Sequence, residues 1–135
     1  NVSMTSTVAL AAADLVVAPV RLDSFGVKGL ARVIDELRLL KNAYGDAIRS
    51  ELVILATHFA PQLARIQRMH QALQQYEKQL APISISLSED FPKSLEQYIP
   101  LSLQKPLCQA SSEYTSFTDH LIKRLIAIEE KRAKQ

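Results

Sequence analysis

Residues that could bind a ligand or move a proton follow directly after the short apolar runs of this sequence. They carry carboxylate, hydroxyl, imidazole and ammonium groups, and they are Asp23, Thr57, His58, Glu89, Asp90 and Lys93. Such groups can hold a polar substrate or act as general acids and bases. Their spacing alone matches no catalytic triad and no ligand cluster, so any chemistry depends on the elements that bring them together.

Phosphate binding by a glycine-rich loop is not supported. A P-loop needs glycines that let backbone amides approach the phosphates, and a lysine that supplies charge. The chain has three glycines, Gly26, Gly29 and Gly45. The tetrapeptide GVKG at 26–29 lacks the required spacing and lies in the first turn of an expected helix. The sequence therefore contains no complete nucleotide-hydrolysing loop.

Metal binding and thiol chemistry have equally little support. The soft ligands are His58, His70, His120 and Cys108, and no two of them have the short spacing typical of a metal site. A nucleophilic Cys108 would need a neighbouring base, so a structural thiol is the preferred interpretation. One cysteine cannot form an internal disulfide, which agrees with a reducing compartment, and we expect a cytoplasmic protein.

Basic residues raise the possibility of contact with nucleic-acid phosphates. Arg65 and Arg68 are three residues apart, off the apolar stripe of an expected helix, and the carboxyl-terminal segment is also basic. Phosphate contacts need only such charge, without any sequence code. A solvated helix face explains the same pattern, and a net charge of +2 makes no case for nucleic acid by itself. Both interpretations stay open.

The elements that must position these residues alternate between strand and helix. Three apolar runs predict strands at Leu15–Val20, Glu51–Thr57 and Ile83–Leu87. The first two are almost continuously aliphatic, as in parallel strands covered on both faces, while the third alternates Ile and Ser, as near a sheet edge.

Apolar residues at three- and four-residue steps predict the helices. These span about Thr5–Ala12, Ser24–Tyr44, Pro61–Gln79 and Ser112–Lys131. Gly45 ends the second helix, and Ser111 or Ser112 could cap the last one. The proline-containing segment Pro92–Pro106 is expected to be mostly loop, with a short helix at Leu95–Tyr98.

This alternation predicts an α/β fold: a partial parallel sheet of about three strands, flanked by helices in a three-layer arrangement. A length of 135 residues with 47% hydrophobic side chains fits a single domain over residues 1–135. The apolar runs are far too short to span a membrane, so we expect no membrane partner. Ligands of such folds bind beyond the carboxyl ends of the strands, where the candidate residues would meet.

Three motifs in order resemble the ParA-type, deviant Walker A family of P-loop ATPases, which includes partition proteins and MinD-like proteins. In LAAADLVVAPVRLDSFGVKGLARVID, the residues at matching places are Ala12, Ala13, Asp14, Pro19, Asp23 and Gly29. VILATHFAPQLARIQRMHQAL resembles the family's next strand and helix. FPKSLEQYIPLSLQKPL has the proline, basic residue and serine that follow the last main strand, and a later Lys-Pro-hydrophobic step at 105–107.

The resemblance covers nearly the whole chain, but only the carboxyl-terminal half of the family's P-loop NTPase domain. It implies a parent that hydrolyses ATP with Mg²⁺ in plasmid or chromosome partition or plasmid replication. The nucleotide-binding loop would lie before Asn1, so this fragment would be inactive and without a cofactor. Family members form homodimers around ATP, bind DNA without sequence preference and respond to a ParB-like partner protein. By position, the resemblance implies that Thr57 and Pro92 lie on the adenine side and that Lys93 contacts DNA.

The loop after Thr57 departs from the family, because Ala60, Pro61 and Gln62 stand where an arginine-bearing loop is common. Arg65 and Arg68 come later and are included as DNA-binding candidates. Two other interpretations stay open. A P-loop amide ligase or synthetase fragment would have a substrate pocket at the strand ends. A non-catalytic α/β interaction module would use an unpaired sheet edge to bind a partner or a second copy.

Overall fold

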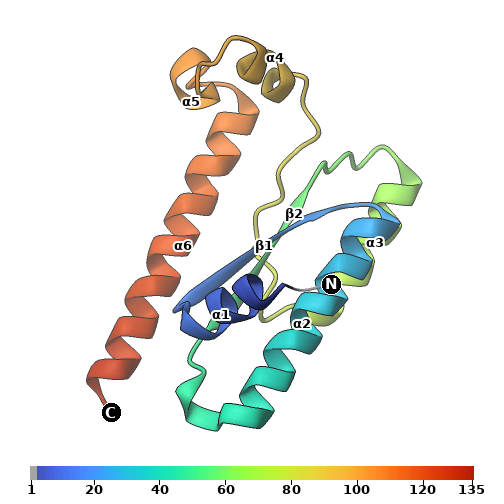
Figure 1. Ribbon diagram of the computed structural model, residues 1–135. Helices are drawn as coiled ribbons and strands as arrows, with labels where there is room; N and C mark the ends of the chain where they lie inside the picture. Colours follow the sequence, from blue (N-terminus) through green and yellow to red (C-terminus); the bar gives the residue numbers. More distant parts are fainter. Residues whose placement is uncertain (1–2) are drawn as a thin grey trace.

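Two parallel strands, with helices on both sides, form the centre of the computed structural model, which describes residues 3–135 (Figure 1). The elements are α1 (Met4–Ala12), β1 (Leu15–Arg21), α2 (Ser24–Tyr44), β2 (Glu51–Thr57), α3 (Ala64–Leu73), α4 (Asp90–Glu96), α5 (Leu101–Gln104) and α6 (Gln109–Ala133). Short 3₁₀ turns follow α2 and α3, at Gly45–Ala47 and Gln74–Tyr76. The predicted α/β class is confirmed at this level.

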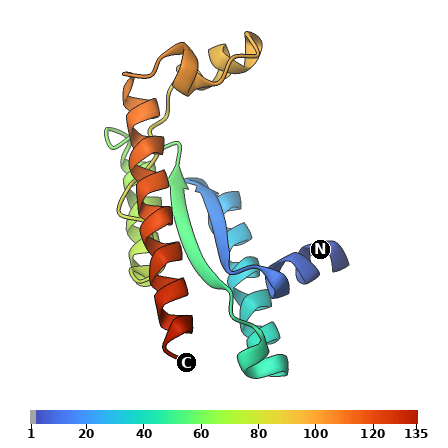
Figure 2. The same ribbon diagram turned by 90° about the vertical axis from the view of Figure 1, so that its left-hand side faces the viewer.

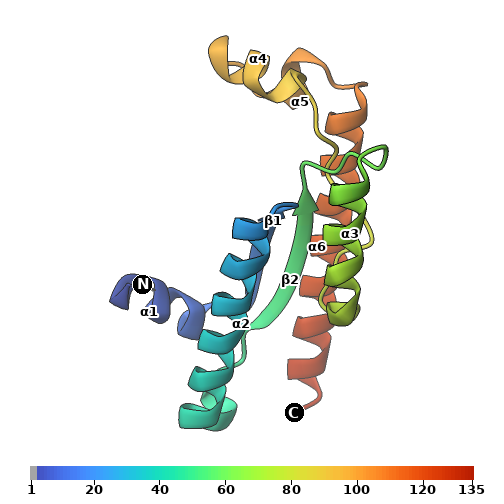
Figure 3. The same cartoon turned by 90° about the vertical axis from the view of Figure 1, so that its right-hand side faces the viewer.

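The two faces of the sheet are covered by different helices. On one face, apolar side chains of α2 and α3, including Leu30, Ile66 and Leu73, pack against β1 and β2. On the other face, Phe117 of α6 packs with Val53 and Leu55 of β2. Figures 2 and 3 show α2 and α6 on opposite sides of β2. Burial on both faces explains the almost continuous aliphatic run of β2.

Helix α2 has the predicted bounds, and its two ends are fixed by local interactions. Asp23 caps the amino end, since its Oδ1 accepts a hydrogen bond from the amide of Gly26 at 2.8 Å. At the other end Gly45 has φ 55°, a left-handed conformation that suits glycine. A Cβ atom on Gly26 would stand 2.1 Å from the carbonyl oxygen of Arg21, so the helix begins directly against the end of β1.

The predicted third strand at 83–87 does not form, and the sheet has two strands within the described residues. Instead, the chain after α3 runs parallel to β2 and makes two isolated bridges, Ile54 with Leu80 and Phe59 with Ser86. The amides of Ala81 and Ile85 donate to Ile54 and Ala56, each at 2.8 Å. Three residues at 82–84 thus oppose one residue of β2, and the first of them is a proline without an N–H group. The bulge interrupts the ladder.

Helices α3 and α6 both differ from their predicted bounds. α3 begins three residues after the predicted start at Pro61 and ends at Leu73, where a 3₁₀ turn replaces the rest of the predicted helix. α6 begins at Gln109, and its cap is Cys108 rather than Ser111 or Ser112. The amide of Ser111 donates to the Cys108 sulfur at 3.5 Å. Cysteine is not among the usual capping residues, so the sequence predicted a serine cap for this helix.

The prediction that 92–106 is mostly loop is wrong, because α4 and α5 form an arm there, beyond the carboxyl end of the sheet (Figure 1). Pro92 lies in the first turn of α4 and Pro100 precedes α5. The amides of a first turn have no partner within the helix, so proline is tolerated at these positions. The arm is fixed by an ion pair of 2.6 Å between Lys105 and Asp90.

Candidate functional site

The carboxyl edge of the sheet, where β1 and β2 end, is the first candidate site. Asp23, the acid that follows β1, uses both carboxylate oxygens within the fold. Its Oδ1 accepts from Gly26, and its Oδ2 pairs with the Arg21 Nε at 3.0 Å. Asp23 is therefore a helix cap that joins β1 to α2.

Thr57 and His58 lie at the end of β2. The Thr57 hydroxyl and the His58 Nδ1 are hydrogen-bonded at 3.2 Å, and His58 has φ 58°, a left-handed conformation that is uncommon outside glycine. The chain turns sharply at His58, after which the Phe59 amide donates to the carbonyl of Ile85 at 2.9 Å. The half-buried Thr57 thus ends β2 next to a constrained turn.

Pro92 and Lys93 lie on α4, beyond the carboxyl edge, and both are exposed. Phe91 holds α4 against α6 through an edge-to-face contact with Tyr114, with ring centroids 5.6 Å apart. Among residues 3–135, no hydrogen bond or ion pair joins α4 to Thr57. The elements that carry the two residues of the expected adenine side therefore lie toward one end of the molecule, with no such bond between α4 and Thr57.

The three DNA-binding candidates are spread over two elements. Arg65 and Arg68 are exposed on α3, on the side away from the buried Ile66 and Leu73. Lys93 is on α4, and Figure 3 shows that helix beyond the end of the sheet while α3 lies beside β2. A surface that used all three would have to extend along this side of the molecule, as a duplex backbone could.

Hydrogen bonds at the junction of α4, α5 and α6 shift two pKa values. The hydrogen bond from Lys105 lowers the pKa of Asp90, and hydrogen bonds with Ser111 lower the pKa of the Cys108 thiol. On α6, burial and the nearby Arg124 lower the pKa of His120. Within residues 3–135, no histidine is hydrogen-bonded to this carboxylate or this thiol, so these shifts reflect structural pairing.

A second candidate is a serine–histidine pair beside the bulged segment. The Ser84 hydroxyl and His70 Nε2 are 3.2 Å apart, and the His70 ring lies 4.9 Å from that of Phe59. A nucleophilic serine would also need a carboxylate to orient the histidine. The nearby Glu113 is instead engaged with Ser86, accepting from its amide at 2.9 Å and its hydroxyl at 2.6 Å. The pair joins the bulged segment to α3.

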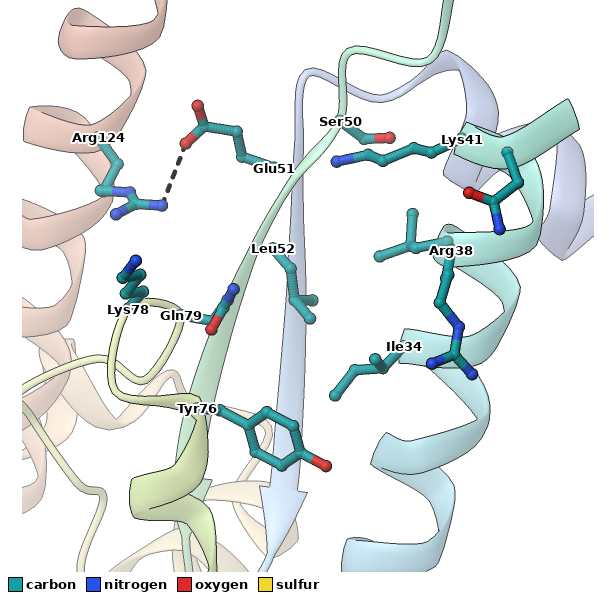
Figure 4. A pocket seen from close by; sticks show the side chains of 12 residues that line it. Ile34, Arg38, Lys41, Ser50, Glu51, Leu52, Tyr76, Lys78, Gln79 and Arg124 are labelled. Carbon is teal, nitrogen blue, oxygen red and sulfur yellow. Dashed lines mark hydrogen bonds and ion pairs between the residues drawn. The ribbon is translucent and has the colours of Figure 1, made fainter. Parts of the chain in front are cut away.

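A third candidate, which could not be predicted from the sequence, is a groove of about 580 Å³ at the opposite, amino end of β2 (Figure 4). Its lining includes four basic residues from α2, α6 and the turn after α3: Arg38, Lys41, Lys78 and Arg124. The three-residue spacing of Arg38 and Lys41 on α2 was the only local signal, because folding alone brings Lys78 and Arg124 to them.

Two features typical of a Mg-ATP site are a glycine-rich loop and a cluster of metal ligands. Gly26 and Gly29 lie within α2 and Gly45 ends it, so no glycine-rich loop faces the carboxyl edge. In the part of the chain that the structure describes, no group of three or more His, Cys, Asp or Glu side chains could hold a metal ion. No helix within 3–135 is long and apolar enough to cross a bilayer.

The fold and its edges define this chain as a parallel α/β protein with a short sheet and an α-helical arm. No protein-family model matches the sequence, and no curated protein matches it.

Proposed function

We propose that this chain is the carboxyl-terminal half of a ParA/MinD-like ATPase domain that acts in plasmid or chromosome partition or in plasmid replication. In this proposal the parent protein binds ATP and Mg²⁺ through a nucleotide-binding loop outside the chain. The chain contributes the adenine side, part of the homodimer surface and part of a DNA-binding surface. A ParB-like protein would be its regulatory partner.

The outer edge of β1 is the observation that carries this proposal. The bonds to β2 start at Asp14, whose carbonyl accepts from Glu51 at 3.1 Å, and end at Leu22, whose amide donates to Thr57 at 3.2 Å. Along a parallel strand, the backbone N–H and C=O groups of successive residues point to opposite edges. Those of Leu15 and Val17 therefore point away from β2, to the outer edge of β1. Within residues 3–135 no strand pairs there. This edge can accept a further strand.

The exposed face of β1 supports the same proposal. α6 packs mainly on β2, and it leaves Val17 38% exposed and Pro19 and Arg21 exposed on the same side of β1. Parallel sheets are usually covered on both faces, and a two-stranded sheet is marginal by itself. A nucleotide-binding half that paired with β1 would also cover this face.

Within the proposed domain, Thr57 and Pro92 stand on the adenine side, at the end of the molecule where β1 and β2 finish. Asp23 has the structural role of joining β1 to α2, and Gly26 lets the helix start against the strand. Lys93, Arg65 and Arg68 supply phosphate contacts to duplex DNA. Each of these assignments follows the resemblance in sequence and the placement of the residue.

DNA binding is the test that the chain itself allows. We expect weak binding to arbitrary duplex DNA whose affinity falls steeply with salt, because neutralised phosphates release counterions. The triple variant Arg65→Gln, Arg68→Gln, Lys93→Gln should reduce the steepness of the plot of log affinity against log salt concentration by roughly 2 to 3. Each phosphate that is no longer neutralised reduces this slope by about 0.9. Fluorescence anisotropy with a labelled duplex measures this slope.

The matched control removes three basic groups on other elements, two on α2 and one before β2, in Lys28→Gln, Arg32→Gln, Arg49→Gln. All three are exposed. The control should keep the slope of the unmodified chain. Affinity that does not depend on salt, or an equal change in both triple variants, would refute the assignment of these residues.

The open edge of β1 also favours a second candidate, a non-catalytic interaction module. In that case the strand that pairs with β1 belongs to a second copy of the chain, since unpaired edges recruit strands. Dimerisation would then depend on protein concentration and not on nucleotide. A chain that stays monomeric at high concentration would exclude this candidate.

A further inference from the structure

The groove at the amino end of β2 has the size and the lining of a small-molecule site. It lies between the end of α2, the start of β2, the turn after α3 and α6 (Figure 4). Its volume of about 580 Å³ is within the range of small-molecule sites in proteins. It is at the opposite end of the strands from Thr57 and Pro92, so it is separate from the proposed nucleotide edge.

The charges that line the groove are mostly positive. Arg38 is paired with Asp35 at 2.5 Å, and Arg124 with Glu51, the one acidic residue of the lining, at 3.1 Å. Lys41 and Lys78 make no ion pair among the residues that the structure describes. Figure 4 shows Lys41 extending from α2 toward the start of β2. Two ammonium groups without a counter-charge favour an anionic ligand.

Arg124 offers a further donor in the groove. Its Nη2 is bound to Glu51, whereas its Nε is buried and has no hydrogen-bond partner within residues 3–135. A buried N–H group without an acceptor is costly, and a charged donor more so. This group lies beneath the surface of the groove, so an anionic oxygen would satisfy it by a charge-assisted hydrogen bond after a shift of the Arg124 side chain.

Part of the remaining wall is apolar and includes an aromatic ring, while Asn42, Ser50 and Gln79 add polar groups. Ile34, Leu37 and Leu52 line it together with Tyr76, and Figure 4 shows the Tyr76 ring, Ile34 and Leu52 directed toward the same space. Such a wall suits a flat ring, since aromatic stacking adds to the burial of apolar surface. The groove thus combines a surface for a ring with donors for an anion.

We propose that this groove binds a phosphorylated ring compound of nucleotide size. The phosphate is held by Lys41 and Lys78, with the Nε of Arg124 as a further donor once that side chain shifts, and the ring lies against Tyr76. Magnesium is not required, because the lining has only one carboxylate and it is already paired. The site does not depend on the proposed ATPase function.

Titration calorimetry with AMP in magnesium-free buffer tests this site on the whole chain. We expect AMP to bind, and adenosine and inorganic phosphate each to bind at least about tenfold more weakly. Adenosine lacks the contacts of the phosphate, and inorganic phosphate lacks the contacts of the ring. The variant Lys41→Gln, Lys78→Gln should lose at least about tenfold in AMP affinity. The control Lys28→Gln, Lys123→Gln removes the same charge from residues outside the groove lining and should change the affinity for AMP by less than about twofold.

Two further variants keep the test decisive if the double variant unfolds. Tyr76→Leu should weaken AMP and leave inorganic phosphate unchanged. Thr57→Val should leave AMP unchanged, since Thr57 lies at the opposite edge. The proposal is overturned if AMP does not bind, if adenosine binds as well as AMP, or if both lysine pairs lower affinity equally. It is also overturned if the groove binds polyglutamate, an acidic polymer, in place of AMP. Loss of AMP binding in Thr57→Val would overturn it as well, and would support the proposed nucleotide edge instead.

Discussion

Gly26 is the residue at which the junction of β1 and α2 leaves least room. A Cβ atom there would meet the backbone oxygen of Arg21 at 2.1 Å, and backbone cannot rotate away as a side chain can. Gly29 lies one turn later on the same helix, with nothing within 4 Å of its Cβ position. The two glycines therefore make a matched pair for a stability test.

We predict that Gly26→Ala lowers the free energy of unfolding by about 1–3 kcal/mol, because the helix must shift away from the strand. Gly29→Ala should raise it by about 0.5–1 kcal/mol, since alanine is the better helix former in an open position. Urea unfolding followed by circular dichroism measures both. If Gly26→Ala were as stable as Gly29→Ala, the close approach of α2 to β1 would be wrong.

For single residues, the sequence predicted which side chains lie at the carboxyl edge of the sheet, but not the contacts that hold them there. The acid after β1 was found from its position, whereas its use as a helix cap depends on the 2.8 Å contact with Gly26. The cap of α6 was assigned to serine because cysteine rarely caps. The basic groove could not be predicted, since its charges lie far apart in the sequence and only folding gathers them.

Strand β1 is the element on which the proposed function depends. Its even-numbered residues, such as Val16 and Ala18, direct their amides to β2 by the register, and its odd-numbered residues direct theirs outward. Pro19 is one of the outward residues, so its missing N–H costs no bond to β2. The outer edge of β1 therefore offers free backbone N–H groups to a further strand mainly in its amino-terminal half, before Pro19.

We predict an alternation of amide hydrogen exchange along β1. The amides of Val16 and Ala18 should be protected, and those of Leu15 and Val17 should exchange much faster because they lack a partner in the described chain. NMR-detected exchange in dilute solution measures this. Equal protection of all four amides would show that the edge is already paired in solution, as the interaction-module candidate requires, and a loss of that protection on dilution would identify a second copy as the partner.

Helix periodicity and strand composition predicted the elements well where one face is continuously buried. α2 and β2 have their predicted bounds because each places an unbroken apolar surface on the core. The run at 83–87 has strand-forming composition, but the bulge beginning at Pro82 interrupts its pairing. The α4–α5 arm was missed because its prolines stand in first turns and caps, where they are compatible with helix.

The whole molecule has two ends with different chemistry. At the carboxyl ends of the strands stand Thr57 and the arm that carries Pro92 and Lys93, and at the amino end of β2 lies the basic groove (Figures 1 and 4). Between them, β1 presents an unpaired edge and a partly exposed face. The proposed function explains this edge as the contact with a nucleotide-binding half.

Magnesium-dependent ATP hydrolysis by the chain extended with the residues encoded directly before Asn1 tests this central claim most directly. We predict that the present chain alone does not hydrolyse ATP above the blank. The extended protein should hydrolyse it, through an upstream glycine-rich loop with two lysines, and substitution of either lysine should abolish the activity. Hydrolysis by the present chain alone, or an extended protein with neither that loop nor activity, would contradict the proposed function.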